Sequence, residues 1–357
     1  MANTMTALGL MSGTSMDGID AALIETDGQN AGKRIASDFL AYPDDIKTAI
    51  RACLGLSADT DGRVAAAETL VTDWHIKMVR NFAAAHDHKI DLVGFHGQTI
   101  FHDPANGRTW QIGDGGRLAR ETGIDVMFDF RTADVQNGGQ GAPLLPLYHQ
   151  ALIRQANLAE PACILNIGGV GNIAWTQGDD IYACDTGPGN ALIDDWMLRQ
   201  TGTAMDRNGE AASLGKIDEA RIERWMQNPF FAAPAPKSLD RNAFADCTVD
   251  DMSTEDGAAT LAAFTVASVI RALALMPAPA SKVIVAGGGR KNPAIMHGLG
   301  SHVAVANADQ MGWPGDYMEA EGFAYLAVRA LRGLHTSLPT TTGCETPTIG
   351  GRLATAK

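Results

Sequence analysis

Short apolar runs alternate along the chain with longer segments in which apolar residues recur at helical spacing. Residues 7–25 contain two apolar runs joined by a turn rich in glycine and serine, which predicts a strand, a tight turn and a second strand. In residues 44–56 and 64–78, apolar side chains recur three and four positions apart, which predicts two helices that each bury one face. Residues 92–95 form a short apolar run and predict a strand that ends at His96.

The segment 163–175 repeats the pattern of residues 7–25: an apolar strand, a turn of small residues and a second apolar strand. The repeat suggests two halves that are built alike, each presenting a glycine-rich hairpin to a common cleft. Hairpins are common, so two unrelated hairpins are the alternative. Further along, the sequence predicts helices at 190–199, 257–275 and 318–332, a buried strand at 282–286, and an irregular tail at 339–357 with one short strand near Thr348.

This alternation of strands and helices favours an α/β fold with mixed sheets. A chain of 357 residues exceeds what one core usually organises, so two domains are expected. We place domain I at 1–128, joined by the returning tail at about 336–357, and domain II at 129–335. No uninterrupted apolar run approaches the ~20 residues of a membrane span.

The net charge of the chain limits the classes of molecule that it is expected to bind. A formal net charge of −13 repels nucleic-acid phosphates and anionic lipid surfaces, so neither is expected as a main partner. A polyanionic ligand must then be held by backbone N–H groups, a metal ion or a few local cations. The five cysteines are scattered without a metal-binding pattern, and no signal peptide is evident. Both features favour reduced thiols in the cytosol.

Three turns of small residues follow apolar strands, at 12–18, 168–171 and 287–289. Glycine lets backbone N–H groups approach a phosphate without a Cβ atom in the way. None of the three matches a Walker-type P-loop or a dinucleotide fingerprint. Each taken alone could be only a turn, but three of them together indicate a phosphate-binding site.

Asp185 opens the short motif 185–190, directly after an apolar run at 181–184. This position predicts a carboxylate at the end of a strand, where the sites of α/β proteins usually form. One interpretation is a general base. The alternative is an aspartate that caps the turn or the helix that follows, and the residues alone favour neither.

His96 and His102 stand six residues apart, so on one strand they would share a face. A metal pair is conceivable, but the sequence offers no clear third ligand. The better interpretation of His96 is a hydrogen bond to substrate.

Asp129 and Arg131 place a carboxylate and a guanidinium two residues apart, with Asp134 close by. Arg131 could bind a ligand carboxylate through a forked pair of hydrogen bonds, or it could join two domains through an ion pair. Glu319 either points into a cleft or stabilises the start of the last predicted helix.

In their order along the chain, these motifs resemble the anhydro-N-acetylmuramic acid kinase family. The resemblance covers residues 9 to about 330 and rests on the segments 9–20, 94–99, 111–114, 129–131, 138–144, 166–169 with Asn172, 185–190, 234–238, 287–293 and 318–320. The sequence departs from the family pattern at 238–241, where Ser-Leu-Asp-Arg replaces a run resembling Ser-Thr-Gly-Arg.

The resemblance implies an actin-like (ribonuclease H-like) fold whose two domains enclose a cleft for ATP and sugar. It implies a cytoplasmic kinase that uses ATP with Mg2+, opens 1,6-anhydro-N-acetylmuramic acid with water and yields N-acetylmuramate 6-phosphate and ADP in murein recycling. A homodimer is compatible with it. By the same likeness Asp185 is catalytic. The residues expected to bind ATP are Gly13, Thr14, Ser15, Met16, Asp17, Gly18, Ile19, Asp20, Gly168, Gly169, Gly287, Gly288, Gly289 and Asn292, and those expected to bind the sugar are His96, Asp129, Arg131, Gly187 and Glu319.

The chemistry of an anhydro sugar changes the task of the base. O6 of a 1,6-anhydro sugar is not a hydroxyl until the C1–O6 bond breaks. We therefore expect Asp185 to activate a water that attacks C1, as in an inverting glycosidase. Two competing functions remain: an ATP-gated sensor on the same fold, which needs no carboxylate at position 185, and a kinase for a different sugar.

Overall fold

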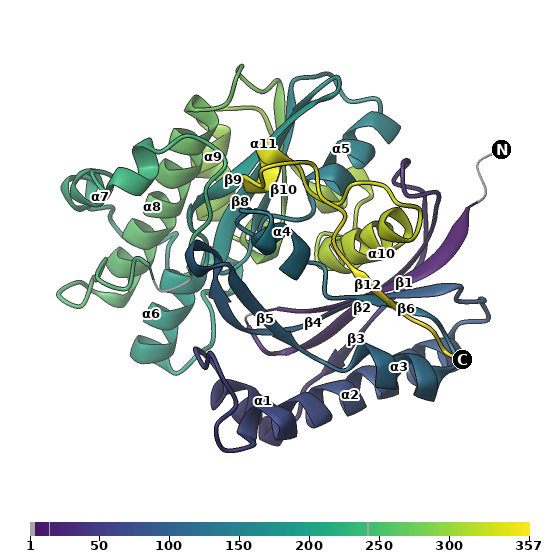
Figure 1. The fold of residues 1–357 in the computed structure, drawn as a ribbon. Coiled ribbons are helices and arrows are strands. Elements are labelled where there is room, and N and C mark those ends of the chain that lie inside the picture. Colours follow the sequence, from purple (N-terminus) through teal and green to yellow (C-terminus); the bar gives the residue numbers. More distant parts are fainter. Residues whose placement is uncertain (1–3, 14, 241–242) are drawn as a thin grey trace. The chain divides into compact units, whose positions relative to one another are not determined.

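One mixed sheet lies at the centre of each of two units in the computed structural model, which describes residues 4–13, 15–240 and 243–357. Unit 1 comprises Met1–Ala156 and Tyr317–Lys357, and unit 2 comprises Asn157–Asp316. The expected α/β class with mixed sheets is confirmed (Figure 1).

The sheet of unit 1 begins with three antiparallel strands, β1, β2 and β3. Strand β4 then pairs parallel to β1, and β6 pairs parallel to β4. The spatial order is β12-β6-β4-β1-β2-β3, and β5 pairs with β4. The strands are β1 (Met5–Ser12), β2 (Gly18–Thr26), β3 (Lys33–Ala41), β4 (Leu92–Asp103), β5 (Arg108–Ile112), β6 (Val126–Phe128) and β12 (Arg352–Ala354).

The sheet of unit 2 repeats this scheme in the order β11-β10-β7-β8-β9. Strands β7, β8 and β9 are antiparallel, β10 is parallel to β7, and β11 is parallel to β10. The prediction of two halves built alike is therefore confirmed in strand order and direction. The strands are β7 (Ala162–Ile167), β8 (Val170–Gln177), β9 (Asp180–Pro188), β10 (Lys282–Ala286) and β11 (Val305–Asn307).

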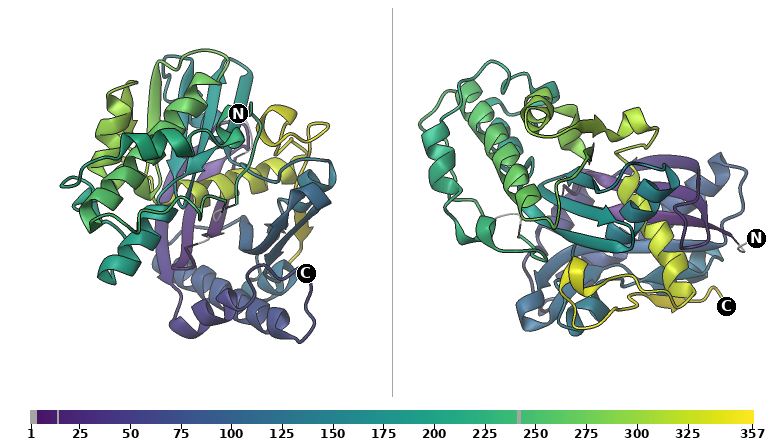
Figure 2. Two further views of the ribbon diagram at one scale, coloured as in Figure 1. Left: turned by 90° about the vertical axis from the view of Figure 1, so that its left-hand side faces the viewer. Right: turned by 90° about the horizontal axis from the view of Figure 1, so that it is seen from above.

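Helices cover both sheets. In unit 1, α1, α2 and α3 lie on one face of the sheet and α10 lies on the other (Figures 1 and 2). The helices of unit 1 are α1 (Asp44–Arg51), α2 (Arg63–Ala85), α3 (Gly115–Thr122), α4 (Thr132–Gln136), α5 (Pro146–Gln155), α10 (Met318–Leu331) and α11 (Pro339–Thr342). Those of unit 2 are α6 (Ala191–Thr201), α7 (Glu219–Trp225), α8 (Thr254–Ala274) and α9 (Pro293–Gly300).

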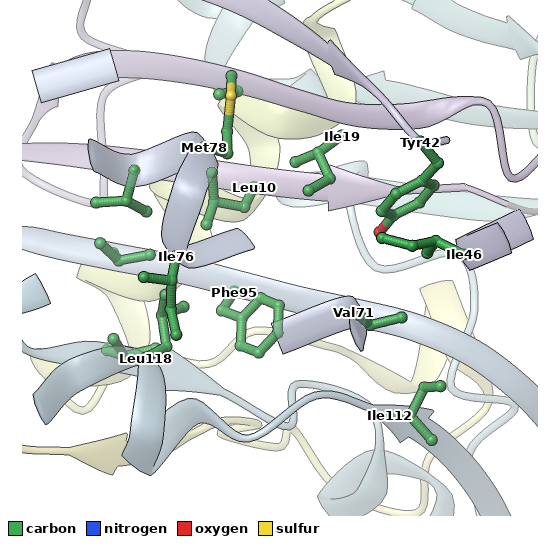
Figure 3. Packing of buried hydrophobic residues seen from close by; sticks show 14 of the residues in the cluster. Leu10, Ile19, Tyr42, Ile46, Val71, Ile76, Met78, Phe95, Ile112 and Leu118 are labelled. Carbon is green, nitrogen blue, oxygen red and sulfur yellow. The ribbon is translucent and has the colours of Figure 1, made fainter. Parts of the chain in front are cut away.

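The core of unit 1 forms between its sheet and helices α1 to α3. Leu10, Ile19 and Phe95 from the strands pack with Val71 and Ile76 of α2, and all five side chains are buried (Figure 3). Burying such side chains stabilises the fold by roughly 1.5–3 kcal/mol each.

Helix α10 crosses its sheet at two glycines. A Cβ atom on Gly9 of β1 would lie 1.8 Å from the carbonyl oxygen of Ala320, and one on Gly94 of β4 would lie 2.3 Å from that of Phe323. Since any side chain at these positions would collide with the helix backbone, the two glycines fix how closely α10 approaches the sheet.

The unit boundaries differ from the expected ones at 128 and 335, because α5 and α10 both belong to unit 1. Helix α10 packs on β1, β2 and β4. On α5, the Tyr148 hydroxyl donates a 2.7 Å hydrogen bond to Glu321 Oε2 of α10.

Two local expectations need adjustment, whereas the expected long, mostly buried helix near 257–275 is confirmed as α8. Strand β4 does not end at His96 but continues to Asp103, where β5 pairs with it. The tail has only an isolated bridge at Thr348, and its strand lies at Arg352–Ala354. Helix α8 is apolar and long enough to cross a membrane by composition, but most of its side chains are buried inside unit 2.

Candidate functional site

The candidate residues fall into two sets, one in each unit, and each set is described within its own unit. Unit 1 contains the loop 13–20 with His96, Asp129, Arg131 and Glu319. Unit 2 contains Asp185, Gly187 and the remaining glycine turns with Asn292. Thr14 and Arg241 lie outside the described residues.

The first glycine turn is anchored by buried polar side chains at the end of β1. The Ser12 hydroxyl donates a 2.5 Å hydrogen bond to Gln98 Oε1 and accepts one of 3.0 Å from the Tyr42 hydroxyl. Gln98 Nε2 donates to the carbonyl oxygen of Gly13 at 3.2 Å. Gln98 was missed as a functional residue, although its motif, 94–99, was recognised.

The exposed middle of this turn is better suited to contact a phosphate than its buried ends at Ser12 and Gly18 are. Among the described residues, the atom nearest to a Cβ atom on Gly13 would be the Ser15 hydroxyl oxygen at 3.8 Å, which leaves room for a ligand beside this backbone. Ser15 donates a 2.7 Å hydrogen bond to Asp17 Oδ1, and both residues are exposed. Met16 closes the turn in the left-handed region, with φ +55°, and its N–H donates to Gly13 O.

The end of the segment has structural roles. A Cβ atom on Gly18 would lie 2.5 Å from the carbonyl oxygen of Leu40, so glycine is required there by strand packing. The side chain of Ile19 is wholly buried in the core (Figure 3). Asp20 lies on β2 and is half-buried.

The side chains of His96 and Arg131 are hydrogen-bonded to each other. Arg131 Nη2 lies 2.9 Å and Nε 3.1 Å from His96 Nε2, which must therefore be the acceptor. His96 Nδ1 donates to Gly97 O at 2.8 Å. Burial and the Arg131 charge hold the pKa of His96 well below its ordinary value. Because both ring nitrogens are engaged, His96 orients Arg131 and has no ring nitrogen left for substrate.

Further contacts fix the position of Arg131. Its Nη1 donates a 2.6 Å hydrogen bond to Gly141 O. The ring of Phe323 packs against His96 in a tilted arrangement, with centroids 4.6 Å apart and planes at 45°, and the guanidinium lies 6.0 Å from the same ring. In the first turn of α10, burial raises the pKa of Glu319 and Arg131 opposes that rise. The group suits recognition of a carboxylate.

A polar pocket of about 230 Å³ opens beside this group. Asp129, in the left-handed region with φ +59°, lines it and faces Arg352 at 3.8 Å. The pocket is smaller than those that enclose a drug-sized ligand, so it suits part of a sugar. It is lined by Glu68, Phe95, His96, Gly97, Thr109, Trp110, Gln111, Gly113, Phe128, Asp129, Thr132 and Arg352.

The two histidines of β4 do not form a metal site. His96 is buried, whereas His102 is exposed and contacts the Thr109 hydroxyl at 3.0 Å. Within the described ranges, no three His, Cys, Asp or Glu side chains gather as metal ligands.

Asp185 is held by a neighbouring loop rather than by a helix end. Its backbone N–H donates to Lys237 O at 2.9 Å, and its Oδ2 accepts from the Leu239 N–H at 2.7 Å. The carboxylate is buried within β9, which continues past it to Pro188. The expectation that the strand ends at Asp185 is therefore wrong.

The alternative that Asp185 caps α6 is not what the structure shows. The N-cap of α6 is Asn190, which makes no side-chain capping bond. The N–H groups of Gly189 and Asn190 donate instead to the carbonyl oxygens of Gly169 and Gly168, at 2.9 and 2.8 Å. Next to Asp185, the strand pairing shifts register, and the buried Thr186 hydroxyl has no hydrogen-bond partner among the described residues.

The two glycine turns of unit 2 abut. A Cβ atom on Gly287 would lie 2.6 Å from the carbonyl oxygen of Ile167, and one on Gly288 would lie 3.3 Å from Asn190 Nδ2. Asn190 Nδ2 also donates to Ile167 O at 3.1 Å. Unit 2 thus brings Gly168 and Gly169 beside Gly287 to Gly289, as a shared phosphate cradle requires.

Two other candidates have packing roles. The side chain of Asn292 caps α9 by accepting from Ala294 N at 3.0 Å. A Cβ atom on Gly187 would lie 2.7 Å from Cβ of Ser268 on α8, so glycine is needed there for close approach.

Arg290 is a functional candidate that the sequence interpretation missed. Its buried guanidinium donates to Gly287 O at 2.9 Å and pairs with Asp309 at 2.9 Å and Asp316 at 2.8 Å. The hydrogen bond from Arg290 lowers the pKa of Asp316 to about 2. The available signal was an arginine directly after three glycines, within the motif 287–293.

Comparison with known proteins bears on the whole chain. A family model described as anhydro-N-acetylmuramic acid kinase matches residues 5–356. The proteins of that name from Acidiphilium cryptum and Rhizorhabdus wittichii are 49% and 48% identical, and the alignments cover 98% and 97% of this chain and 98% of each relative. A solved xylulose kinase from Lactobacillus acidophilus is 11% identical with a TM-score of 0.46, covering 99% of this chain and 94% of that one.

The expected actin-like fold agrees with the repeated sheets of the two units. The full-length family match and the identity to both relatives decide the assignment: this chain belongs to the anhydro-N-acetylmuramic acid kinase family.

Proposed function

We propose that this protein uses ATP to phosphorylate 1,6-anhydro-N-acetylmuramic acid while water opens the anhydro ring, so that N-acetylmuramate 6-phosphate and ADP are released. The observation that carries the proposal is Asp185, a buried carboxylate held by the Leu239 N–H in the motif 185–190 of this kinase family. A non-catalytic ATP sensor would need no carboxylate at that position.

In the proposed reaction, Asp185 takes a proton from a water molecule as the water oxygen bonds to C1. The C1–O6 bond breaks, and O6 bonds to the γ-phosphorus of ATP while the bond to the β-phosphate oxygen breaks. The phosphoryl group takes the place of the acid that protonates the leaving oxygen in an inverting glycosidase. Asp185 therefore acts on water and not on a sugar hydroxyl.

The glycine turns are proposed to bind the ATP phosphates. Gly13 has an accessible backbone in unit 1, and Gly287 and Gly288 adjoin Gly168 and Gly169 in unit 2. Backbone N–H groups in such turns bind anions without a basic side chain, which suits a chain with a net charge of −13.

Mg2+ is expected to arrive with ATP. Among the described residues there is no preformed cluster of three metal ligands, which fits an ion held largely by phosphates and water with one or two carboxylates. Asp17 and Asp20 supply that donor type beside the first turn. When bound, the ion neutralises charge on the phosphates.

Arg131 is proposed to bind the lactyl carboxylate of the sugar. His96 and Gly141 hold the guanidinium in place. Glu319, in the first turn of α10, lies close enough to Arg131 for the guanidinium charge to counter the burial that raises the pKa of Glu319. Asp129 lines the adjoining pocket and could accept a hydrogen bond from a sugar hydroxyl.

This reaction belongs to murein recycling in the cytoplasm, with small molecules as partners rather than nucleic acid or membrane. A homodimer is compatible with the proposal.

The test is a coupled ADP-release assay in which the anhydro sugar and N-acetylmuramic acid, which has no anhydro bridge, are compared in parallel. We expect ADP release with the anhydro sugar. ATP binding without turnover would indicate a sensor, and turnover of only the open sugar would refute the ring-opening reaction.

A further inference from the structure

Asp134 is a wholly buried carboxylate that the proposed reaction does not use. It lies on α4, three residues after Arg131. Its Oδ2 accepts a 2.7 Å hydrogen bond from Gly141 N, and its Oδ1 accepts from the hydroxyls of Thr342, at 2.6 Å, and Ser337. A buried carboxylate is costly unless such bonds satisfy it, so a role in stability alone would be served as well by apolar packing.

Gly141 connects this carboxylate to Arg131. Its N–H is bonded to Asp134, and its carbonyl oxygen accepts the 2.6 Å bond from Arg131 Nη1. Gly141 has φ +66°, and a Cβ atom on Gly139 would lie 2.2 Å from Asp134 Oδ2. The loop 138–141 therefore follows the shape of the carboxylate closely, and Asp134 determines where the carbonyl group that holds Arg131 lies.

The C-terminal segment 337–348 completes the arrangement. Ser337 and Thr342 are buried, and the Thr342 carbonyl oxygen accepts a 2.7 Å hydrogen bond from Gln140 N. Asn137 binds the same segment, since its Nδ2 donates to the Thr348 hydroxyl at 2.7 Å. The segment 337–348, which is far away in the sequence, is thus hydrogen-bonded to the loop that positions Arg131.

We propose that Asp134 is a positioning residue for sugar binding and that the segment 337–348 acts through it. The Thr342 and Ser337 hydroxyls hold Asp134, Asp134 holds Gly141, and Gly141 holds Arg131. The inference rests on the proposed function, in which Arg131 binds the sugar carboxylate. Because small displacements of a positioning group cost much binding, losing one of these bonds should weaken sugar binding selectively.

The test removes one hydroxyl at nearly constant volume. Thr342→Val should raise the Kd and KM for the anhydro sugar about tenfold, as expected for one lost hydrogen bond to a charged group. The KM for ATP should stay within about twofold, and Thr342→Ser should restore sugar binding. Thr341→Val is the matched control, because among the described residues the equally buried Thr341 hydroxyl is hydrogen-bonded to Leu338 of its own turn and not to Asp134. Equal losses in Thr342→Val and Thr341→Val would overturn the inference.

A double-mutant cycle tests whether Thr342 affects sugar binding through Arg131. In an Arg131→Ala background, Thr342→Val should change the Kd for the sugar, measured by calorimetry, by less than about twofold. A further tenfold loss there would show that Thr342 does not act through Arg131. If Thr342→Val fails to fold, as judged by its melting temperature, Ser337→Ala replaces it with the same expectations.

Assays of the wild-type protein distinguish a failure of the proposed function from a failure of the inference about Asp134. If it does not turn over or bind the anhydro sugar, the proposed function fails and the inference falls with it. If it does, and Arg131→Ala weakens binding while Thr342→Val does not, only the inference fails.

Discussion

Arg131 Nη2 lies 2.9 Å from His96 Nε2, so a permanently charged donor is held by a neutral imidazole acceptor. Burial keeps the pKa of His96 well below its ordinary value, which preserves the acceptor through the physiological range. A cation fixed in this way differs from a surface arginine, because its direction is set before the ligand arrives.

Replacing Arg131 should therefore affect the sugar and spare ATP. We expect Arg131→Ala to raise the Kd for the anhydro sugar roughly 10- to 100-fold, the range for a charge-assisted hydrogen bond, with Arg131→Lys intermediate. Arg120→Ala, at an exposed position on α3, is the matched control. Calorimetry at pH 6, 7 and 8 should also give one sugar affinity. An affinity that titrates near pH 6.5 would mean that His96 becomes charged.

Asp185→Asn should remove the base while keeping an oxygen that can accept from the Leu239 N–H. We expect kcat to fall by about 10²- to 10⁴-fold, the usual contribution of general-base catalysis, with both KM values within a few-fold. Asp180→Asn, at the exposed start of the same strand, should leave kcat unchanged. Near-wild-type turnover by Asp185→Asn would remove that residue from the mechanism.

Arg290 should matter for the nucleotide and not for the sugar. Arg290→Lys keeps the charge but cannot hold Gly287 O, Asp309 and Asp316 at once. We expect the KM for ATP to rise about tenfold while the KM for the sugar stays within about twofold. Lys291→Ala removes an exposed partner of the same Asp316 and is the control. If both variants change the KM for ATP alike, Arg290 does not order the turn.

His75 should make the fold acid-sensitive. It is wholly buried, Nε2 has no hydrogen-bond partner among the described residues, and burial lowers its pKa to about 4. Between pH 6.5 and 4 the unfolded chain binds the proton and the folded chain does not, so stability is present above pH 6.5 and is lost as the pH falls.

Lowering the pH from 7 to 5 should cost about 2 kcal/mol through this residue. His75→Gln should lose less stability than the wild type over that interval in denaturant unfolding. Identical losses in the two proteins would show that His75 does not carry this acid sensitivity.

The sequence predicted local features well where a residue's role depends on its neighbours along the chain. The turn at Gly13, the helix of residues 64–78 and the repeated hairpin at 163–175 were all identifiable from spacing alone. Gly18 and Ile19, which are expected to bind ATP with the rest of their motif, also take part in strand packing and in the core. A motif does not separate a ligand-binding residue from one that holds the turn in shape.

Residues whose roles depend on distant partners could not be assigned. Gln98 holds Ser12 across 86 positions, and Asp134 holds Thr342 across 208. The unit boundary was misplaced for the same reason. The periodicity of α10 shows that it buries a face, but only its contact with Gly9 and Gly94 shows which sheet it covers.

The most direct measurement of the central claim is turnover of the anhydro sugar with ATP in water enriched in oxygen-18. If water activated by Asp185 attacks C1, one labelled oxygen should appear at C1 of N-acetylmuramate 6-phosphate, and the phosphoryl group and ADP should remain unlabelled. A labelled phosphoryl group, or a phosphorylated product that keeps the anhydro bridge, would contradict the account.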